Sequence, residues 1–203
     1  MLDKRNFYIN GKWIKPSKKN DLNVINPSTE ESFATISLGN KEDVNIAVEA
    51  ASSAFQSWSL SNKSERISLL EKLLKIYHDR WKEITEIMTL EMGAPLDWSS
   101  SAQTTSGSDH IVDFIKRLKD FQFEKKFEKN SNNFITYEAI GVCGLITPWN
   151  WPLNQIVLKV IPALAAGCTM ILKPSEIAPL SGMLFAEMID EAGFPPGVFN
   201  LVN

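Results

Sequence analysis

The last third of the sequence decides the fold, and residues 140–202 read IGVCGLITPWNWPLNQIVLKVIPALAAGCTMILKPSEIAPLSGMLFAEMIDEAGFPPGVFNLV. Apolar runs that suit buried strands alternate with patterns that suit helices, at 140–147, 153–166, 169–172, 179–192 and 198–202. Near-continuous apolar strands between amphipathic helices are typical of a parallel sheet covered on both faces. This order predicts a β-α-β-α-β unit of three strands, with ligands beyond the carboxyl ends of the strands.

The first 120 residues predict a hairpin and then several helices. The runs 7–9 and 12–14 flank Asn10 and Gly11, residue types that accept the positive φ of a tight turn. Asn40, with Asp43 three residues later, is placed to cap a helix. Apolar side chains then recur at helical spacing in three stripes: Val44, Val48, Ala51 and Phe55; Ile67, Leu70, Leu74 and Tyr77; and Ile84, Ile87 and Met88. Gly93 and Pro95 are expected to end the third helix, and a further helix is expected up to Leu118.

A second hairpin is expected between residues 121 and 137. Phe121, Phe123 and Phe127 alternate with polar residues, a turn falls at 131–133, and the run 134–137 returns. The neighbouring sequence offers no cover for the apolar side of this hairpin, which points to a partner surface.

The composition argues against several classes of protein. The 203 residues are 44% hydrophobic and 22% charged, with a formal net charge of -3, so neither nucleic acid nor an anionic membrane surface is an expected partner. No segment reaches the roughly 18 apolar residues of a membrane span. Two cysteines are too few for a secreted disulfide framework, and we expect a cytoplasmic protein. His78 and His110 lie on separate expected helices without metal-ligand spacing, so no metal is expected.

Two short motifs stand where such a sheet binds a nucleotide. Pro148-Trp149-Asn150-Trp151-Pro152 follows the first strand, and Lys173-Pro174-Ser175-Glu176 follows the second. Further motifs occur, in order, at 8–13, 26–30, 91–95, 141–147, 163–167 and 197–202. In order and spacing the series closely resembles the aldehyde dehydrogenase superfamily over essentially the whole chain.

The resemblance implies a truncated, NAD-dependent aldehyde dehydrogenase fold of the α/β class with a Rossmann-like parallel sheet. Residues 1–120 would be the amino-terminal part of the cofactor-binding domain, 121–139 an oligomerisation hairpin, and 140–203 the Rossmann-like segment. The glycine-containing cofactor turn, the glutamate base and the cysteine nucleophile of the family are expected beyond Asn203, so the catalytic domain would be absent. The intact enzyme would be a homo-oligomer, a dimer or tetramer, acting on an aldehyde.

The resemblance assigns catalytic roles to two residues. In the family a thiolate attacks the aldehyde, and the oxyanion that forms needs a donor fixed in advance. Asn150 matches the family's side-chain donor, although a structural turn asparagine is the plain alternative. Lys159 matches a lysine that supports charge near the base, and its alternative is an ordinary helix lysine with a solvated ammonium.

The same likeness assigns cofactor contacts to residues at both strand ends. Lys173 and Glu176 resemble the pair that holds the adenosine ribose, because a carboxylate accepts hydrogen bonds from both ribose hydroxyls. That carboxylate would repel a 2′-phosphate, which favours NAD over NADP, and a surface ion pair at a helix start is the alternative. The remaining expected cofactor contacts are Ile146, Thr147, Pro148, Trp149, Asn150, Pro174 and Ser175. Trp151 stands where the family more often has phenylalanine, which bears on substrate size.

Cys143 and Cys168 are weighed as alternative nucleophiles and assigned to the core. Each lies at or beside an expected buried strand, and neither matches the family's cysteine loop. Three functions remain open: an enzyme part that oxidises aldehydes to carboxylic acids, a non-catalytic nucleotide-binding or oligomerising fragment, and an unstable truncated product.

Overall fold

The predicted β-α-β-α-β unit is present in the computed structural model, which describes residues 1–129 and 132–203. It consists of β8 (Val142–Ile146), α6 (Pro152–Ala166), β9 (Thr169–Lys173), α7 (Leu180–Ala192) and β10 (Phe199–Leu201). The three strands pair in parallel, with Gly144 opposite Ile171 and Ile171 opposite Asn200. Gly167 and Gly193 end the two helices in the left-handed conformation.

The sheet has five strands, where the sequence predicted three. The expected first hairpin, β2 (Phe7–Ile9) and β3 (Lys12–Ile14), extends the sheet in the order β3-β2-β10-β9-β8. Asn10 and Gly11 make its turn with φ of 53° and 72°. The fully buried Asn200 connects the two parts, because its Oδ1 accepts a hydrogen bond from the Asn10 N–H at 2.9 Å. This connection spans most of the chain, so no local pattern could predict it.

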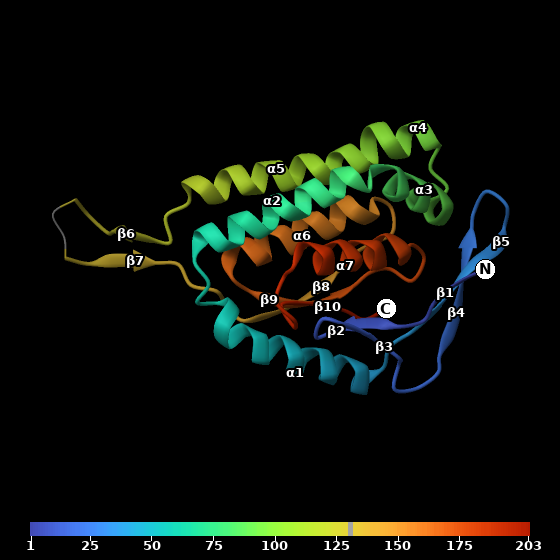
Figure 1. Cartoon of the computed structure of the whole chain (residues 1–203), viewed down its shortest axis with the longest axis horizontal. Coiled ribbons are helices and arrows are strands. Elements are labelled where there is room, and N and C mark those ends of the chain that lie inside the picture. The colour runs from blue at the N-terminus through green and yellow to red at the C-terminus, as the bar shows by residue number, and fades with distance from the viewer. Residues whose placement is uncertain (130–131) are drawn as a thin grey trace.

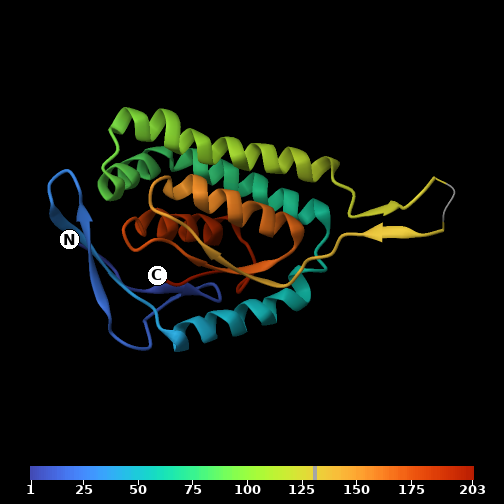
Figure 2. The ribbon, with the colours of Figure 1, turned by 180° about the vertical axis from the view of Figure 1, so that it is seen from behind.

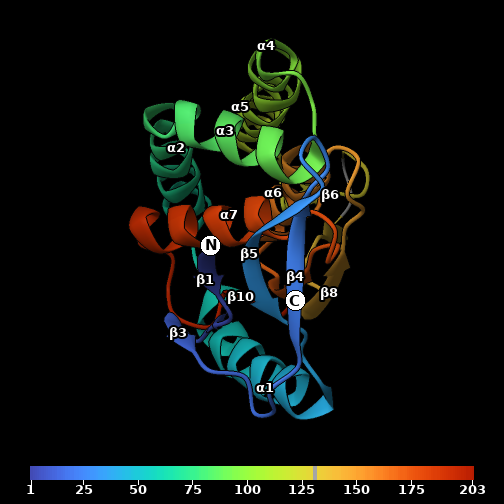
Figure 3. The ribbon, with the colours of Figure 1, turned by 90° about the vertical axis from the view of Figure 1, so that its right-hand side faces the viewer.

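Helices cover both faces of this sheet (Figure 1). α1 (Lys41–Trp58) packs on one face, and α6 and α7 pack on the other. α2 (Lys63–Asp79), α3 (Trp81–Met92) and α5 (Thr105–Asp120) form an outer layer over α6 and α7 (Figure 3). A short helix, α4 (Leu96–Trp98), and a π-helical segment, Ser99–Thr104, connect α3 to α5. The three amino-terminal helices are thus confirmed, and the fourth begins with irregular turns.

One predicted helical stripe is partly wrong. In α1, Val44 and Val48 are exposed, whereas Ala47 and Ala51 are fully buried. The reason is the close approach of α1 to the sheet: the hydroxyl of Thr169, the first residue of β9, donates to the Ala51 carbonyl of α1 at 2.9 Å. Only small side chains fit a contact of this kind, so the alanines face inward and the valines face outward.

Two smaller sheets lie at opposite ends of the molecule (Figures 1 and 2). At one end β1 (Leu2–Lys4) pairs with β5 (Glu31–Ser37), which also pairs with β4 (Asp21–Asn26). At the other end the second hairpin, β6 (Glu124–Lys126) and β7 (Phe134–Thr136), projects from the body.

The strand expected over 121–128 is shorter than predicted. Only Glu124–Lys126 pairs as a strand. At its base Phe121 packs edge-on against Phe123 at 4.9 Å and against Tyr137 at 5.4 Å, and both Phe121 and Tyr137 remain exposed. Of the turn expected at 131–133, Ser131 lies outside the described residues.

Candidate functional site

The carboxyl ends of β8 and β9 form one shared edge. Ile146 lies opposite Lys173 in the ladder, and the Thr147 N–H donates to the Lys173 carbonyl at 3.2 Å. Both predicted motifs therefore leave the sheet side by side, one leading into α6 and the other into α7. This is the edge at which open α/β sheets bind ligands.

Asn150 lies in the turn between β8 and α6 with its side chain exposed. Pro152 occupies the first turn of α6, where its missing N–H costs nothing and its fixed φ starts the helix. Trp151 precedes the helix, and its carbonyl accepts from the Gln155 N–H at 3.0 Å. Asn150 is thus held in a short turn, and no hydrogen bond from its side chain is found within residues 1–129 and 132–203.

Apolar surface flanks this turn. Ile146, the last residue of β8, is 72% exposed, and Trp149, in the turn that follows, is 48% exposed. Thr147, between them, is buried, and its Oγ1 has no hydrogen-bond partner in the described part of the chain. Buried hydroxyls usually have a partner, so Thr147 is an exception directly beneath the exposed turn.

Lys173 and Glu176 form the predicted pair. Lys173 Nζ lies 3.0 Å from Glu176 Oε2 and also donates to the Pro174 carbonyl at 3.0 Å. The pKa of Glu176 is lowered, first by a hydrogen bond from its own backbone N–H and then by Lys173. Both side chains are about half exposed, so the edge carries an ionised carboxylate that solvent and a ligand can reach.

The structure does not bring Lys159 to Asn150. Lys159 is half-buried at the middle of α6. At 1.5 Å per residue, it lies roughly 10 Å further along the helix axis than the first turn. Asn150 and the Lys173–Glu176 pair therefore share the edge, and Lys159 stands apart from it.

Two contacts beside the turn escaped the sequence analysis. The ring of Trp98, from α4, packs edge-on against Trp151 at 5.1 Å. In the next turn of α6, Asn154 donates to Ser106 Oγ from α5. No sequence signal marks Trp98 or Ser106, because each meets α6 only through the packing of α4 and α5 on it.

Both cysteines lie away from this edge. Cys143 is in the first half of β8, and Cys168 directly precedes β9, so both are near the amino ends of the strands. Burial raises the pKa of Cys143 to about 11, and the thiol stays protonated at neutral pH. These positions agree with assigning both residues to the core.

Among the described residues, no three His, Cys, Asp or Glu side chains gather as a metal centre requires. No helix of the described chain has the length and hydropathy needed to cross a membrane.

A mixed sheet covered by helices, with a parallel β8-β9-β10 part and two motifs at one strand edge, defines a Rossmann-like α/β protein. The profile of the aldehyde dehydrogenase family matches residues 13–203, and the chain belongs to that family. Among curated proteins, 3-succinoylsemialdehyde-pyridine dehydrogenase from a Pseudomonas species is 50% identical over 204 residues, which cover 100% of this chain and 42% of that protein.

Solved structures agree. An aldehyde dehydrogenase from Bartonella henselae superposes with a TM-score of 0.98 at 56% identity, over 100% of this chain and 43% of that one. Aldehyde dehydrogenase C from Pseudomonas syringae, solved as an alanine variant with NAD+ and octanal, superposes with a TM-score of 0.95 at 42% identity, over 98% of this chain and 40% of that one. The chain corresponds to an amino-terminal portion of these proteins and spans about two fifths of their length.

Proposed function

We propose that this chain supplies the adenosine-binding surface and the oxyanion donor of an enzyme that oxidises an aldehyde to a carboxylic acid with NAD. The observation that carries the proposal is the shared edge of β8 and β9, where Asn150 and the Lys173–Glu176 pair are both exposed. A family member solved with NAD+ and octanal supports both ligand classes. The nucleophile is proposed to lie outside this chain, on a cysteine that forms the thiohemiacetal and then the thioester.

NAD would supply the hydride acceptor, and residues of this chain would hold the cofactor. Glu176 would accept hydrogen bonds from the ribose hydroxyls, and Lys173, 3.0 Å away, would orient that carboxylate. Ile146, Thr147, Pro148 and Trp149 supply backbone groups and apolar surface, while Pro174 and Ser175 shape the turn. An ionised Glu176 repels a 2′-phosphate, so NAD is preferred to NADP.

Calorimetric titration of the 203-residue chain with NAD and with NADP tests this surface. We expect NAD to bind more tightly than NADP, and Glu176→Gln to weaken NAD binding about 10- to 100-fold through the loss of charged hydrogen bonds. Asp79→Asn, which breaks the exposed Lys75–Asp79 pair, is the matched control and should leave the affinity for NAD unchanged. Equal affinity for NAD and NADP, or a Glu176→Gln variant that binds NAD as tightly as wild type, would contradict the ribose-binding role of Glu176. A chain without a folded circular dichroism spectrum would instead favour the unstable-fragment hypothesis.

Asn150 is proposed to donate its side-chain amide to the oxyanion that forms when the thiolate adds to the aldehyde. A chimera tests this role, with this chain replacing the matching 43% of the Bartonella enzyme. We expect Asn150→Ala to lower kcat about 100- to 1000-fold. The exposed Asn45→Ala on α1 is the control and should leave kcat unchanged. An Asn150→Ala chimera with the kcat of the unsubstituted chimera would contradict the oxyanion role of Asn150.

Lys159 is proposed to support charge in parts of the enzyme beyond this chain. Its distance from the first turn of α6 leaves it no direct role at Asn150. In the same chimera, Lys159→Met should shift the pH profile of kcat rather than abolish turnover. A loss of activity at every pH would contradict this supporting role.

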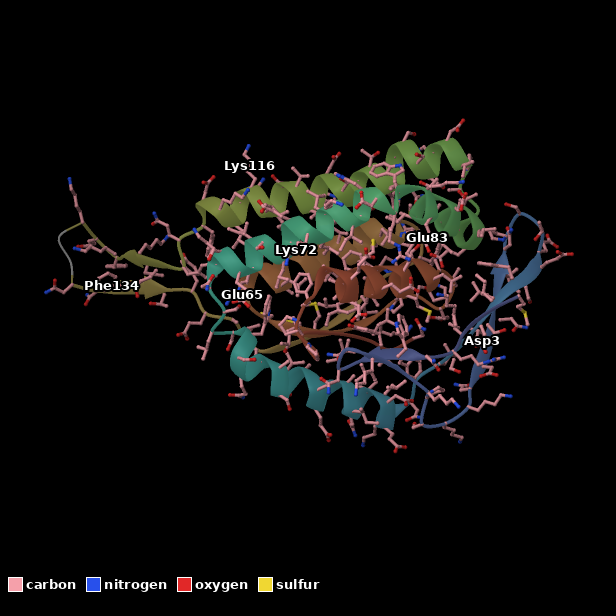
Figure 4. All side chains as sticks on the ribbon, viewed as in Figure 1. Asp3, Glu65, Lys72, Glu83, Lys116 and Phe134 are labelled. Carbon is pink, nitrogen blue, oxygen red and sulfur yellow. The ribbon has the colours of Figure 1, made fainter. Side chains whose placement is uncertain are left out.

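The β6–β7 hairpin favours a second function, self-association. Phe127 and Phe134 are 61% and 52% exposed, and Figure 4 shows Phe134 on the projecting hairpin, away from the body. In the described chain, β6 and β7 pair only with each other. Exposed strand edges and apolar patches of this kind are normally covered by another chain, and we propose that a second copy covers them.

We also propose that the protein is located in the cytoplasm. Its two cysteines are free, which fits a reducing compartment.

A further inference from the structure

Two side-chain contacts join the first turn of α6 to the segment that runs from α4 to α5. Trp98 packs edge-on against Trp151 at 5.1 Å, and Asn154 donates to Ser106 Oγ. Trp151 is the N-cap residue of α6 and Asn154 is its third residue, and side chains at these two positions lie close together. The aromatic pair and the polar pair are therefore neighbours on one surface, next to the turn that holds Asn150.

The segment from α4 to α5 is held from behind by α3. Its π-helical part, Ser99–Thr104, hydrogen-bonds to α3 at both ends. Thr89 Oγ1 donates to the Ser99 hydroxyl at 3.0 Å, and the Thr85 and Thr104 hydroxyls lie 3.2 Å apart. π-Helical turns occur frequently at functional sites. The residues on either side of this part, which meet α6, are thus held in fixed positions, as a selective binding surface requires.

The polar pair has hydrogen-bonding capacity that the described chain does not use. Asn154 and Ser106 are both half-buried. Within residues 1–129 and 132–203, the second N–H of the Asn154 amide and its carbonyl oxygen have no partner, and the Ser106 hydroxyl donates to no other group. A partly desolvated polar group without a partner costs free energy, so such a pair favours a ligand that bonds to it over an alkyl group of the same shape.

The pair lies within reach of an aldehyde whose oxygen is held at Asn150. Asn154 follows Asn150 by four residues, which corresponds to roughly 6 Å along the helix axis. A few carbon atoms of a substrate chain span this distance. Trp98, which is 42% exposed, and Trp151 offer apolar surface to those carbon atoms beside the same turn.

We propose that Ser106 and Asn154 determine substrate specificity by selecting aldehydes that carry a ketone a few carbon atoms from the aldehyde carbon. The Ser106 hydroxyl and the free N–H of Asn154 donate to the ketone oxygen, while the two tryptophan rings contact the carbon chain. An alkyl chain leaves both donors without a partner. This inference rests on the proposed role of Asn150 in holding the aldehyde oxygen.

The chimera of this chain with the Bartonella enzyme tests the pair with two aldehydes of matched shape. Levulinic aldehyde carries a ketone, and isocaproaldehyde has a methyl-substituted carbon in its place. We expect a higher kcat/KM for levulinic aldehyde. Asn154→Leu should lower the ratio of the two kcat/KM values about 10-fold, because a lost hydrogen bond affects only the ketone. Ser106→Ala should lower the ratio in the same direction.

Continued oxidation of isocaproaldehyde by both variants would show that they are folded. Asn45→Leu makes the same amide-to-leucine change at an exposed position of α1 and should leave the ratio unchanged.

The ratio separates specificity from a purely structural role. If Asn154→Leu and Ser106→Ala lower kcat/KM for both aldehydes equally, or leave both values unchanged, the proposal is wrong and the pair only joins α5 to α6. An unsubstituted chimera that oxidises both aldehydes equally well would also overturn the proposal, while leaving the proposed aldehyde oxidation intact. A chimera that oxidises neither aldehyde would contradict the proposed function and this inference with it.

Discussion

Glu91 is a carboxyl group buried between two helices, and it is 1% exposed. It comes from the end of α3 and accepts hydrogen bonds from the Leu180 and Ser181 N–H groups at 2.6 and 2.9 Å, and from the Ser181 hydroxyl. These are free donors at the start of α7, which has no side-chain cap of its own. A residue that the sequence marked only as part of a family motif therefore caps a helix 89 positions away.

Glu91 should make stability depend on pH. Burial raises its pKa to about 7 from 4.5, against the opposing effect of its hydrogen bonds. Between these values the folded state holds a proton that the unfolded state has lost, so the free energy of unfolding falls as pH rises. The free energy of unfolding falls by at most about 3 kcal/mol in total, and the fall is nearly complete when the pH reaches about 7.

Urea denaturation of wild type and Glu91→Gln at about pH 5 and about pH 8 measures this effect. Glutamine stays neutral, so the advantage of wild type over the variant should shrink as pH rises. The exposed Glu49→Gln is the control, and its difference from wild type should stay constant. A constant difference for Glu91→Gln as well would mean that Glu91 does not titrate in this range.

At the scale of elements, α1 shows how a local signal and a long-range contact combine. Asn40 accepts from the Glu42 N–H at 2.7 Å, and Asp43 accepts from the Asn40 N–H at 3.0 Å, which completes a capping box. Asp43 also accepts from the Ser17 N–H at 2.7 Å and holds the preceding loop against the helix. The cap could be predicted from the sequence, whereas the link to Ser17 could not.

Removal of the α1 cap should lower stability without changing the fold. Asn40→Ala leaves the first-turn N–H groups without a partner and should cost about 1 kcal/mol. The midpoint of urea unfolding measures the change. Asn20→Ala, at an exposed position outside any helix, is the control. If Asn40→Ala is as stable as Asn20→Ala, water replaces the cap without lowering the free energy of unfolding.

At the scale of the whole molecule, the projecting hairpin distinguishes this chain from a simple globular body. It extends away from the sheet and its helices (Figures 1 and 2), with aromatic rings exposed along it. At its base Phe121 and Tyr137 pack edge-on against each other but are still 42% and 44% exposed, so apolar surface is uncovered both at the base and further out. An oligomer contact is the arrangement that would bury it.

Charged substitutions on the hairpin should abolish self-association. We expect light scattering to give a mass above that of one chain for the wild type, and a monomer for the double variant Phe127→Lys, Phe134→Lys. Leu60→Lys, on the body and 83% exposed, should associate like wild type. A monomeric wild type would rule out the hairpin as a sufficient contact for this chain.

The sequence by itself determined the alternation of strands and helices, the turn at Asn10-Gly11, the cap at Asn40 and the motifs around Asn150 and Glu176. Each of these depends on residues close in sequence, where periodicity, backbone preference and hydrogen bonding act locally. Only the tertiary structure decided that β2 and β3 join the sheet through Asn200, that Glu91 caps α7, that alanines rather than valines face the sheet in α1, and that Trp98 reaches Trp151. The physical reason is that these contacts join surfaces far apart in the chain, whose fit depends on packing rather than on local pattern.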